Sequence, residues 1–497
     1  MIKWTVSVQL RNAPSSGKSD YSYPRNMTMP VSTRPHHKIA LVCFGTEENY
    51  GLLFVGGELL QFDQEIRYFD AEKDAITDEI VAWMPDYIFF SPLTRYFPAA
   101  MNMLREIRQH IPGVISVFGG HHACSDPAII DREEIDVVVV GPVRGSIEKI
   151  LSGEKGLIRT PLTDPADMPV PARIEYYRDI PRIASRYRKF MLSMLGCPWN
   201  CAYCSSSADH LRDIYGKEAH RRYYLSRRPI PAIIAEAKQI LALGKTEEIE
   251  WVDDDIFSGP DIETWLPEFV DTWEREIGVP MYVSSTSTLT LKVSDNVLAT
   301  LKRIVNCIGI GIQAIRPESL KLLNRAWDNE ENMKRAYDRL VTYGFAVNLQ
   351  AIVGLPVEDP VEDALETVKG LQRIGPGSIC SVYPLQIYPG TMMEKYCRDH
   401  NLALSALASG DTNTGIPGIA FSDDVTKKLR NLCKLATFFV KYHIDERWMR
   451  IFLTIDFPES TSQALSMERY YECVVDRLGT KGIELFNEIK RGMKLVY

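Results

Sequence analysis

The sequence has no uninterrupted hydrophobic run of about 18 residues, the length that a helix needs to cross a bilayer, which argues against a membrane span. Residues 1–36 are polar and lack the apolar core and small-residue cleavage site of a secretory signal. This stretch therefore predicts a loose arm on a cytoplasmic protein. Ten cysteines in 497 residues are too few for a disulfide scaffold, so a close group of them favours metal binding or catalysis.

The chain also has no polybasic run, and its net charge is −8. Both features argue against a nucleic-acid partner and favour a small-molecule or peptide substrate. There is no fixed-period repeat and no low-complexity tract, so a solenoid is not expected. What is present is the composition of a globular protein, 45% hydrophobic and 25% charged, with a length that predicts about three domains.

From Lys38 onward, short β-branched runs alternate with amphipathic stretches, a pattern typical of a parallel sheet covered by helices. Five strands and three helices in about 105 residues predict a doubly wound Rossmann-like domain over residues 37–155. Its ligand is expected at the carboxyl ends of the strands. The expected strands are 39–44, 66–69, 87–91, 114–118 and 137–140, and the expected helices are 52–61, 76–83 and 99–111.

Five prolines between 157 and 181 favour an extended connector, and we place a linker at residues 156–185. A second series of six βα units follows over residues 186–400 and predicts a partial (β/α)6 barrel of parallel strands. Residues 401–497 are expected to be mainly helical. The expected barrel strands are 190–194, 249–252, 281–285, 308–312, 347–352 and 379–385.

Three cysteines, Cys197, Cys201 and Cys204, follow the first predicted barrel strand with three and two residues between them. Three thiolates at this spacing can each hold one iron of a [4Fe–4S] cluster and leave the fourth iron open. An open iron can bind S-adenosylmethionine (SAM) and pass one electron into its sulfonium. The alternatives are simple burial of the cysteines or a zinc site completed by His210 or His220.

This region resembles the radical SAM superfamily in several motifs and in their order. Tyr203 stands where that family has an aromatic residue beside adenine, and residues 251–257 (Trp-Val-Asp-Asp-Asp-Ile-Phe) are similar to its second-strand motif. Residues 309–313 are similar to the fourth-strand Gly-x-Glu segment, with Gln313 in place of Glu. The resemblance implies SAM contacts at Tyr203, Asp253, Asp254, Asp255, Ser285, Gln313 and Gly354.

The doubly wound domain before the barrel resembles the cobalamin-dependent branch of this superfamily. The matching stretches are 85–91 with Thr94, Gly119-Gly-His-His122, and 136–141. The resemblance implies cobalamin contacts at Glu48, Asn49, Gly51, Ser91, Thr94, Gly119, Gly120, His121 and Gly141. An ordinary tight turn is the alternative reading of the two adjacent glycines.

Two departures from that branch matter. Glu48 stands where many relatives have the histidine beneath cobalt, which implies a cobalt with no histidine ligand and easier methyl transfer to a radical. Residues 141–145 replace an acidic motif that contacts the nucleotide tail in the relatives.

The resemblance implies a methyltransferase that uses a [4Fe–4S] cluster, SAM and methylcobalamin to methylate an unactivated carbon through a 5′-deoxyadenosyl radical. An electron donor such as flavodoxin or ferredoxin is expected, and Trp251, Tyr383 and Tyr388 are expected to line the substrate pocket. Three alternatives are a cobalamin-dependent cyclase or rearrangement enzyme, a cobalamin carrier or sensor with a structural cluster, and a methylthiotransferase acting on transfer RNA. The acidic charge argues against the last of these.

Overall fold

The computed structural model describes residues 35–406 and 415–456. The chain divides into Met1–His36, of which residues 35 and 36 are described, and a second unit, His37–Tyr497. The arm expected at residues 1–36 therefore lies almost wholly outside the described residues. Among the helices of the described residues, none is long and apolar enough to cross a membrane.

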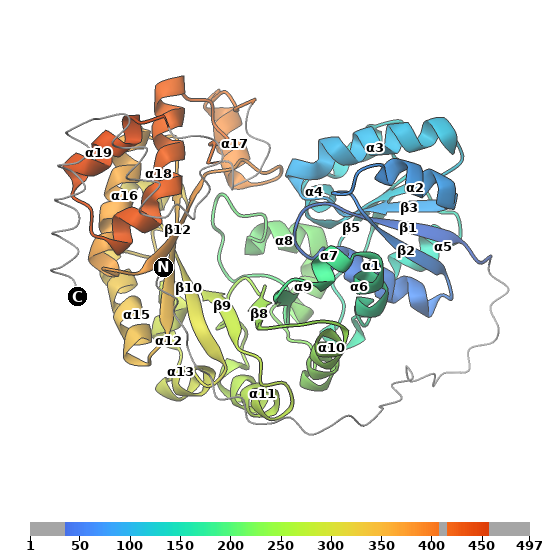
Figure 1. Cartoon of the computed structure of the whole chain (residues 1–497), viewed down its shortest axis with the longest axis horizontal. Helices are drawn as coiled ribbons and strands as arrows, with labels where there is room; N and C mark the ends of the chain where they lie inside the picture. Colours follow the sequence, from blue (N-terminus) through green and yellow to red (C-terminus); the bar gives the residue numbers. More distant parts are fainter. Residues whose placement is uncertain (1–34, 407–414, 457–497) are drawn as a thin grey trace. The chain divides into compact units, whose positions relative to one another are not determined.

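The first half of the second unit is a six-stranded parallel sheet with the strand order β2-β1-β3-β4-β5-β6 (Figure 1). Its strands are β1 (Lys38–Cys43), β2 (Glu65–Asp70), β3 (Tyr87–Phe90), β4 (Ile115–Phe118), β5 (Val137–Val140) and β6 (Gly156–Arg159). Its main helices are α1 (Tyr50–Gln61), α2 (Ile76–Trp83), α3 (Phe97–His110), α4 (Gly120–Ser125) and α5 (Ser146–Leu151). The interior strand β5 consists of four buried valines, as expected for a parallel strand covered on both faces. The strand order reverses between β1 and β3, and ligands bind at such switch points.

The segment expected to be an extended connector is more structured than its prolines suggested. Strand β6 pairs with β5 in parallel, and two helices follow, α6 (Arg173–Asp179) and α7 (Pro181–Ala184). Pro181 occupies the first turn of α7, where the missing N–H costs no hydrogen bond. The expectation of an extended connector is therefore wrong where α6 and α7 form.

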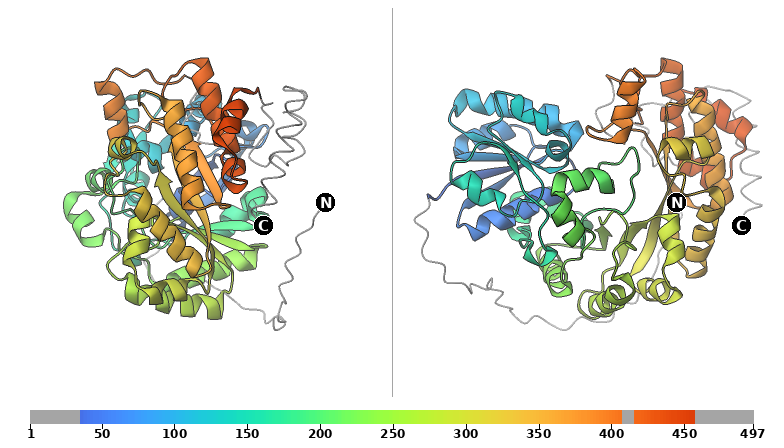
Figure 2. Two further views of the ribbon diagram at one scale, coloured as in Figure 1. Left: turned by 90° about the vertical axis from the view of Figure 1, so that its left-hand side faces the viewer. Right: turned by 180° about the vertical axis from the view of Figure 1, so that it is seen from behind.

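The second half is a parallel sheet with the order β12-β11-β10-β9-β8-β7, in which β12 and β7 are the two edges of an open barrel. The strands are β7 (Arg188–Met191), β8 (Glu248–Trp251), β9 (Met281–Ser285), β10 (Val305–Gln313), β11 (Ala346–Val353) and β12 (Ile379–Pro384). The helices are α8 (Ala208–Tyr215), α9 (Lys217–Tyr223), α10 (Ile230–Leu243), α11 (Ile262–Glu276), α12 (Ser287–Lys292), α13 (Asp295–Leu301), α14 (Pro317–Leu322), α15 (Glu330–Thr342) and α16 (Pro360–Ile374). Figure 2 shows the helical layer along the outer side of these strands.

Alternation along the barrel strands sets which side chains face the helices. On β11, Val347, Leu349, Ala351 and Val353 are buried, and the residues between them are half-buried or exposed. The half-buried residues form the open inner face. Both predicted sheets are confirmed, and the six barrel strands lie within a few residues of their expected bounds.

The C-terminal part is helical where it is described, with α17 (Met392–Asp399), α18 (Asp423–Lys441) and α19 (Glu446–Thr454). Helix α18 packs against β12 and α16, so it covers one edge of the open barrel. Buried Gln372 of α16 fixes this packing by donating to the carbonyl oxygens of Phe439 and Ile444, both at 3.0 Å. Residues 407–414 and 457–497 of the part expected to be helical lie outside the described residues.

Candidate active site

A cavity of about 480 Å³ lies where the carboxyl ends of the first sheet meet the start of the barrel. One wall consists of the loops after β1, β3, β4 and β5. The other wall includes residues 190–196, which run into the cysteine loop, together with Ser205, Ser206 and Asp254. The volume is typical of a small-molecule site. Asp254, one of the seven residues expected to contact SAM, therefore borders the same space as the loops of the first sheet.

Eight of the nine residues expected to contact cobalamin line this cavity: Glu48, Asn49, Gly51, Ser91, Gly119, Gly120, His121 and Gly141. The ninth, Thr94, is not among the lining residues, and its hydroxyl lies 3.3 Å from Nδ1 of His122. Asn49 organises the wall, because its side chain caps α1 by accepting from the N–H of Leu52 and donates to the carbonyl of Ser91 at 2.9 Å.

Two glycines of this wall leave no room for a side chain. A Cβ on Gly120, at φ +77°, would overlap Oγ of Ser91, and a Cβ on Gly141, at φ +107°, would overlap the carbonyl oxygen of Thr160. Only glycine is compatible with these positions, so backbone lies directly at the cavity surface. His121, an exposed residue, follows Gly120 and also lines the cavity.

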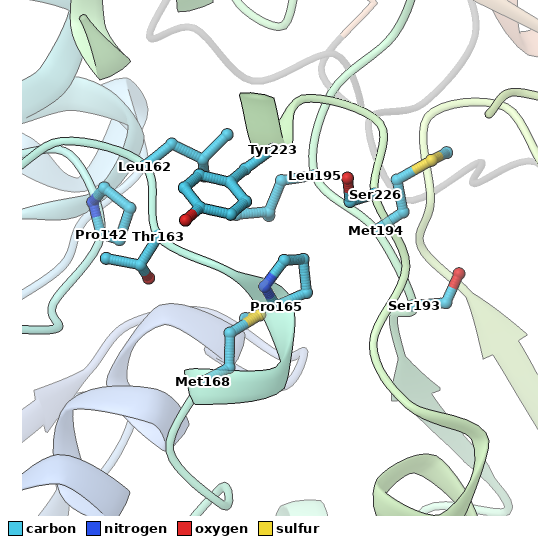
Figure 3. A pocket seen from close by; sticks show the side chains of 10 residues that line it. All are labelled: Pro142, Leu162, Thr163, Pro165, Met168, Ser193, Met194, Leu195, Tyr223 and Ser226. Carbon is cyan, nitrogen blue, oxygen red and sulfur yellow. The ribbon is translucent and has the colours of Figure 1, made fainter. Parts of the chain in front are cut away.

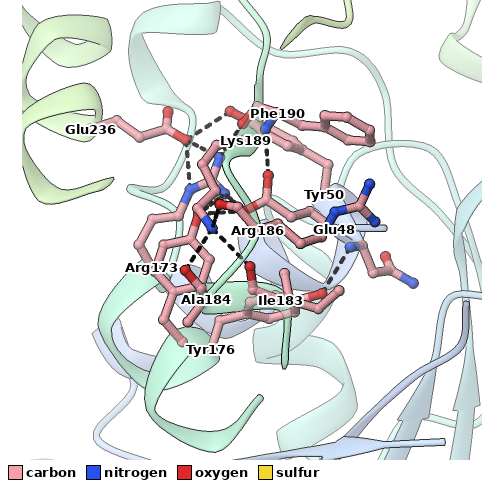
Figure 4. Close-up of polar contacts among 12 residues, drawn as sticks. Glu48, Tyr50, Arg173, Tyr176, Ile183, Ala184, Arg186, Lys189, Phe190 and Glu236 are labelled. Carbon is pink, nitrogen blue, oxygen red and sulfur yellow. Dashed lines mark hydrogen bonds and ion pairs between the residues drawn. The ribbon is translucent and has the colours of Figure 1, made fainter. Parts of the chain in front are cut away.

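Glu48 borders the cavity, but its carboxylate is bonded to the protein. Oε1 accepts from Nη1 of Arg173 at 2.9 Å and from the hydroxyl of Tyr177, and Oε2 accepts from the backbone N–H of Phe190 (Figure 4). The Glu48 side chain is only 3% exposed. This carboxylate is therefore fully engaged by groups that hold the loop after β1 against the first barrel strand.

Arg173 of α6 joins this loop to a second carboxylate. Its Nε and Nη2 donate to Oε1 of Glu236 on α10, at 3.0 and 2.8 Å, and its guanidinium lies 5.1 Å from the ring of Tyr50. Although burial raises the pKa of Glu236, the guanidinium groups of Arg228 and Arg173 lower it below its usual value. Below this network, Nζ of Lys189 donates to three backbone carbonyls at the end of α7 (Figure 4).

The cysteine loop runs from the end of β7 to α8, and its entry is locked by Tyr224. The Tyr224 hydroxyl donates to the carbonyl of Cys197 at 2.7 Å and accepts from its N–H at 3.0 Å. Gly196, at φ +98°, lies against the same ring, where any Cβ would overlap it. Burial raises the pKa of Cys204 to about 12, so bound iron would have to supply the charge that stabilises its thiolate.

The two histidines considered as a fourth zinc ligand are engaged elsewhere. Nε2 of His210 lies 3.3 Å from Oγ of Ser125, and the ring of His220 stacks on Tyr224 at 3.8 Å. Within residues 35–406 and 415–456, no three His, Cys, Asp or Glu side chains are grouped to hold one metal ion. The thiols of Cys197, Cys201 and Cys204 are therefore not gathered around one point, as a zinc ion would need, whereas a cluster would need each of them to reach only one of its irons.

The acidic triplet after β8 divides into structural and cavity-facing members. Asp253 accepts from the N–H groups of Ser193 and Met194, at 2.7 and 3.2 Å, and is buried beside Arg227. Asp254 is the member that borders the cavity. Asp254 is exposed, whereas Asp253 and Asp255 are buried.

Asp255 links the ends of β8 and β9. It accepts from Oγ of Ser285 at 2.9 Å and from the N–H and hydroxyl of Thr286 at 2.8 and 2.9 Å. Burial raises the pKa of Asp255 to about 6, although these donors lower it. The Asp255 and Ser285 side chains expected to contact SAM thus bind each other, and they set the shape of the strand ends.

The other expected SAM residues lie at or near the carboxyl ends of successive strands. Gln313 has an unusual φ of +69° at a bulge in β10, which turns its amide back over Gly311. Such backbone strain is typical of functional sites. Gly354, at φ +77°, follows β11, and Tyr203 lies in the cysteine loop itself.

The three aromatic residues expected to line the substrate pocket do not border the cavity. Trp251 is a core residue, 2% exposed, whose ring packs 5.2 Å from Phe269 and 6.1 Å from Trp273. Its assignment as a substrate residue is wrong, because its position on β8 faces the covering helices. Tyr383 is half-buried on β12, and Tyr388 lies in the turn after β12.

Sequence reasoning missed the contribution of the segment after β6. A side chamber of about 30 Å³, with room for about two water molecules, branches from the cavity (Figure 3). Leu162 and Met168 line it on one side, and Met194 and Leu195 on the other. Five of its lining residues also border the main cavity: Pro142, Thr163, Met168, Met194 and Leu195. The residues before α6 therefore form part of the wall.

Comparison with known proteins gives two family matches. Residues 38–151 match the B12 binding domain, and residues 191–369 match the radical SAM superfamily. No curated protein matches the chain in sequence.

Several solved structures share the fold. One is TsrM from Kitasatospora setae, a radical SAM methyltransferase with cobalamin and a [4Fe–4S] cluster bound, at 14% identity and a TM-score of 0.54, covering 75% of this chain and 77% of TsrM. A structure of TsrM with tryptophan substrate and a SAM analog has 12% identity and a TM-score of 0.57, and the match covers 82% of this chain and 90% of TsrM. OxsB, a cobalamin-dependent SAM radical enzyme, has 15% identity and a TM-score of 0.59, and the match covers 92% of this chain and 83% of OxsB.

Proposed function

Because this chain joins a B12-binding domain to a radical SAM domain and so belongs to the cobalamin-dependent radical SAM enzymes, we propose that it is a methyltransferase. It moves a methyl group from SAM, by way of cobalamin, to an unactivated carbon of a small-molecule or peptide substrate. The single observation that carries this proposal is the cavity of about 480 Å³, which the glycine-rich strand ends and the start of the cysteine loop both border.

The residues present fit the three groups that this chemistry needs. Cys197, Cys201 and Cys204 would hold a [4Fe–4S] cluster, and the Gly119, Gly120 and Gly141 wall would receive the corrin of cobalamin. When bound, the cluster supplies one electron to SAM, and cobalamin supplies the methyl carrier. The protein contributes binding, orientation and the exclusion of water.

Asp254 is the ionisable group best placed to bind SAM. It lies beside the cysteine loop, and in its ionised form it can accept from a charged amino group. Asp253 and Asp255 hold the neighbouring strand ends in place, so the position of Asp254 is set by rigid elements on both sides. Gln313 keeps an acceptor for a hydroxyl group without adding a charge.

The engaged state of Glu48 limits what the loop after β1 would offer to bound cobalamin. The carboxylate is held by Arg173, Tyr177 and Phe190, and no histidine occupies this position. The loop would therefore border the cofactor through its backbone and through Asn49, and bound cobalamin would supply the methyl carrier.

The test uses the full chain reconstituted with iron and sulfide, reduced, and incubated with SAM and cob(I)alamin in the absence of substrate. We expect S-adenosylhomocysteine to accumulate in a cobalamin-dependent manner, together with slow formation of 5′-deoxyadenosine. Formation of 5′-deoxyadenosine without S-adenosylhomocysteine would favour a rearrangement enzyme instead. Absence of both products would favour a cobalamin carrier or sensor and would contradict the proposal.

A further inference from the structure

The segment after α14 forms a brace around the cysteine loop, and we define it as residues 323–328. The carbonyl of Leu323 accepts from the N–H of Ala202 at 2.9 Å, and Nδ2 of Asn324 donates to the carbonyl of Asn200 at 2.6 Å. Trp327 stacks on Trp199 of the loop, with ring centroids 4.0 Å apart and planes at 14°. The brace therefore touches the loop at several successive positions.

Arg325 is the charged residue of the brace that reaches a cluster cysteine. It is 2% exposed, and its Nη1 lies 3.5 Å from Sγ of Cys201. Its Nη2 donates to the carbonyl of Gly311 at 2.7 Å, so the same guanidinium also contacts the end of β10. The guanidinium lies 4.5 Å from the centre of the Trp327 ring, which fixes its plane.

One carboxylate stands near this cation. Oδ2 of Asp328 lies 3.6 Å from Nη2 of Arg325 and also accepts from the hydroxyl of Ser287. The guanidinium is therefore a fixed positive charge that lies near both one cluster ligand and the Asp328 carboxylate. A guanidinium stays protonated at every pH at which proteins are studied.

From this arrangement we propose that Arg325 raises the reduction potential of the cluster held by Cys197, Cys201 and Cys204. The inference deepens the proposed function and rests on it, because it requires that cluster. Arg325 is a positioning residue in this role, since it acts through the sulfur of Cys201. Hydrogen bonds and charges at cluster sulfurs are among the main determinants of such potentials.

The electron balance gives the direction of the effect. The oxidised cluster with three thiolates carries a net charge of about −1, and addition of one electron makes it about −2. The electron comes from a low-potential one-electron donor, and no bond breaks and no proton moves. A fixed cation in a low-dielectric site stabilises the more negative form more strongly, so reduction becomes easier.

The experiment is a redox titration of the reconstituted full chain at pH 8 without SAM, with dithionite as the donor and electron paramagnetic resonance of the reduced cluster as the readout. For Arg325→Gln we expect a midpoint potential at least 59 mV more negative. At a fixed solution potential, this corresponds to a tenfold decrease in the ratio of reduced to oxidised cluster. Arg325→Lys keeps the charge and should lie closer to the wild type. Asp328→Asn removes the opposing charge and should shift the midpoint in the positive direction.

Asn324→Gly is the matched control, because it removes a neutral contact of the same brace with the same loop and keeps the positive φ of 54°. At a fixed solution potential, its ratio of reduced to oxidised cluster should stay within threefold of the wild-type ratio. The proposal is overturned if Arg325→Gln is indistinguishable from wild type, or if Asn324→Gly shifts the potential as much. If Arg325→Gln fails to hold a cluster, the decision passes to Asp328→Asn, whose midpoint must move upward. Absence of any cluster signal in the wild type would instead contradict the proposed function.

Discussion

Replacement of Arg173 by methionine is the change whose consequence follows most directly from the structure. Arg173 is fully buried between two buried carboxylates, at 2.9 Å from Glu48 and 2.8 Å from Glu236. The substitution keeps the apolar volume of the side chain and removes its charge. Loss of one partner of a buried ion pair costs about 3–5 kcal/mol, because it leaves a buried charge uncompensated.

Two carboxylates lose their partner here, but Arg228 still binds Glu236 at 2.8 Å, and Tyr177 still donates to Glu48. We therefore expect a loss of about 3–5 kcal/mol in unfolding free energy at pH 7 rather than twice that amount. The assay is urea denaturation followed by circular dichroism. Arg228→Met is a useful comparison, since it removes the second positive charge that pairs with Glu236.

The pH dependence provides a sharper test of the same reasoning. In the folded wild type the pKa of Glu236 is lowered from 4.5, so its ion pair stabilises the fold above the unfolded pKa and loses this effect as the pH falls through the lower, folded value. In Arg173→Met the carboxyls can protonate at a higher pH. The loss of unfolding free energy in the variant, relative to wild type, should thus be largest at pH 7 and smaller near pH 5. A deficit that is the same at both pH values, or one below about 1 kcal/mol, would refute the ion-pair explanation.

Further predictions concern the cofactor residues. Cys201→Ala should abolish both the cluster absorbance and 5′-deoxyadenosine formation after reconstitution, and retention of either would count against the cluster assignment. Gly120→Val should weaken cobalamin binding at least tenfold in equilibrium dialysis, because any Cβ at this position overlaps Ser91, whereas Gly113→Ala, whose Cβ meets open space, should not. Asp254→Asn should weaken SAM binding about tenfold or more by calorimetry, since it removes the one acidic charge of the triplet that borders the cavity.

The sequence-based predictions were accurate for features that depend on neighbouring residues along the chain, and less accurate for features that depend on tertiary packing. Eleven of the twelve strands, all except β6, were predicted because β-branched runs such as 137–140 signal a buried parallel strand locally. The segment 156–185 was misjudged because proline restricts its own residue and its neighbour, yet it is compatible with the first turn of a helix, as at Pro181. Trp251 was misassigned because the face of a strand that meets the helices cannot be distinguished from the open face by one aromatic residue.

The sequence by itself determined the features whose parts lie close together along the chain. The three cysteines fall within eight residues, so their spacing alone predicts a common site, and the glycines of residues 119–120 and 141 follow strands that the pattern already reveals. Only the tertiary structure decided which side chains meet across the fold. Arg173 reaches Glu48 across 125 positions, and Arg325 reaches Cys201 across 124. The physical reason is that charge pairing depends on distance in space, and local propensity carries no information about partners so far apart in sequence.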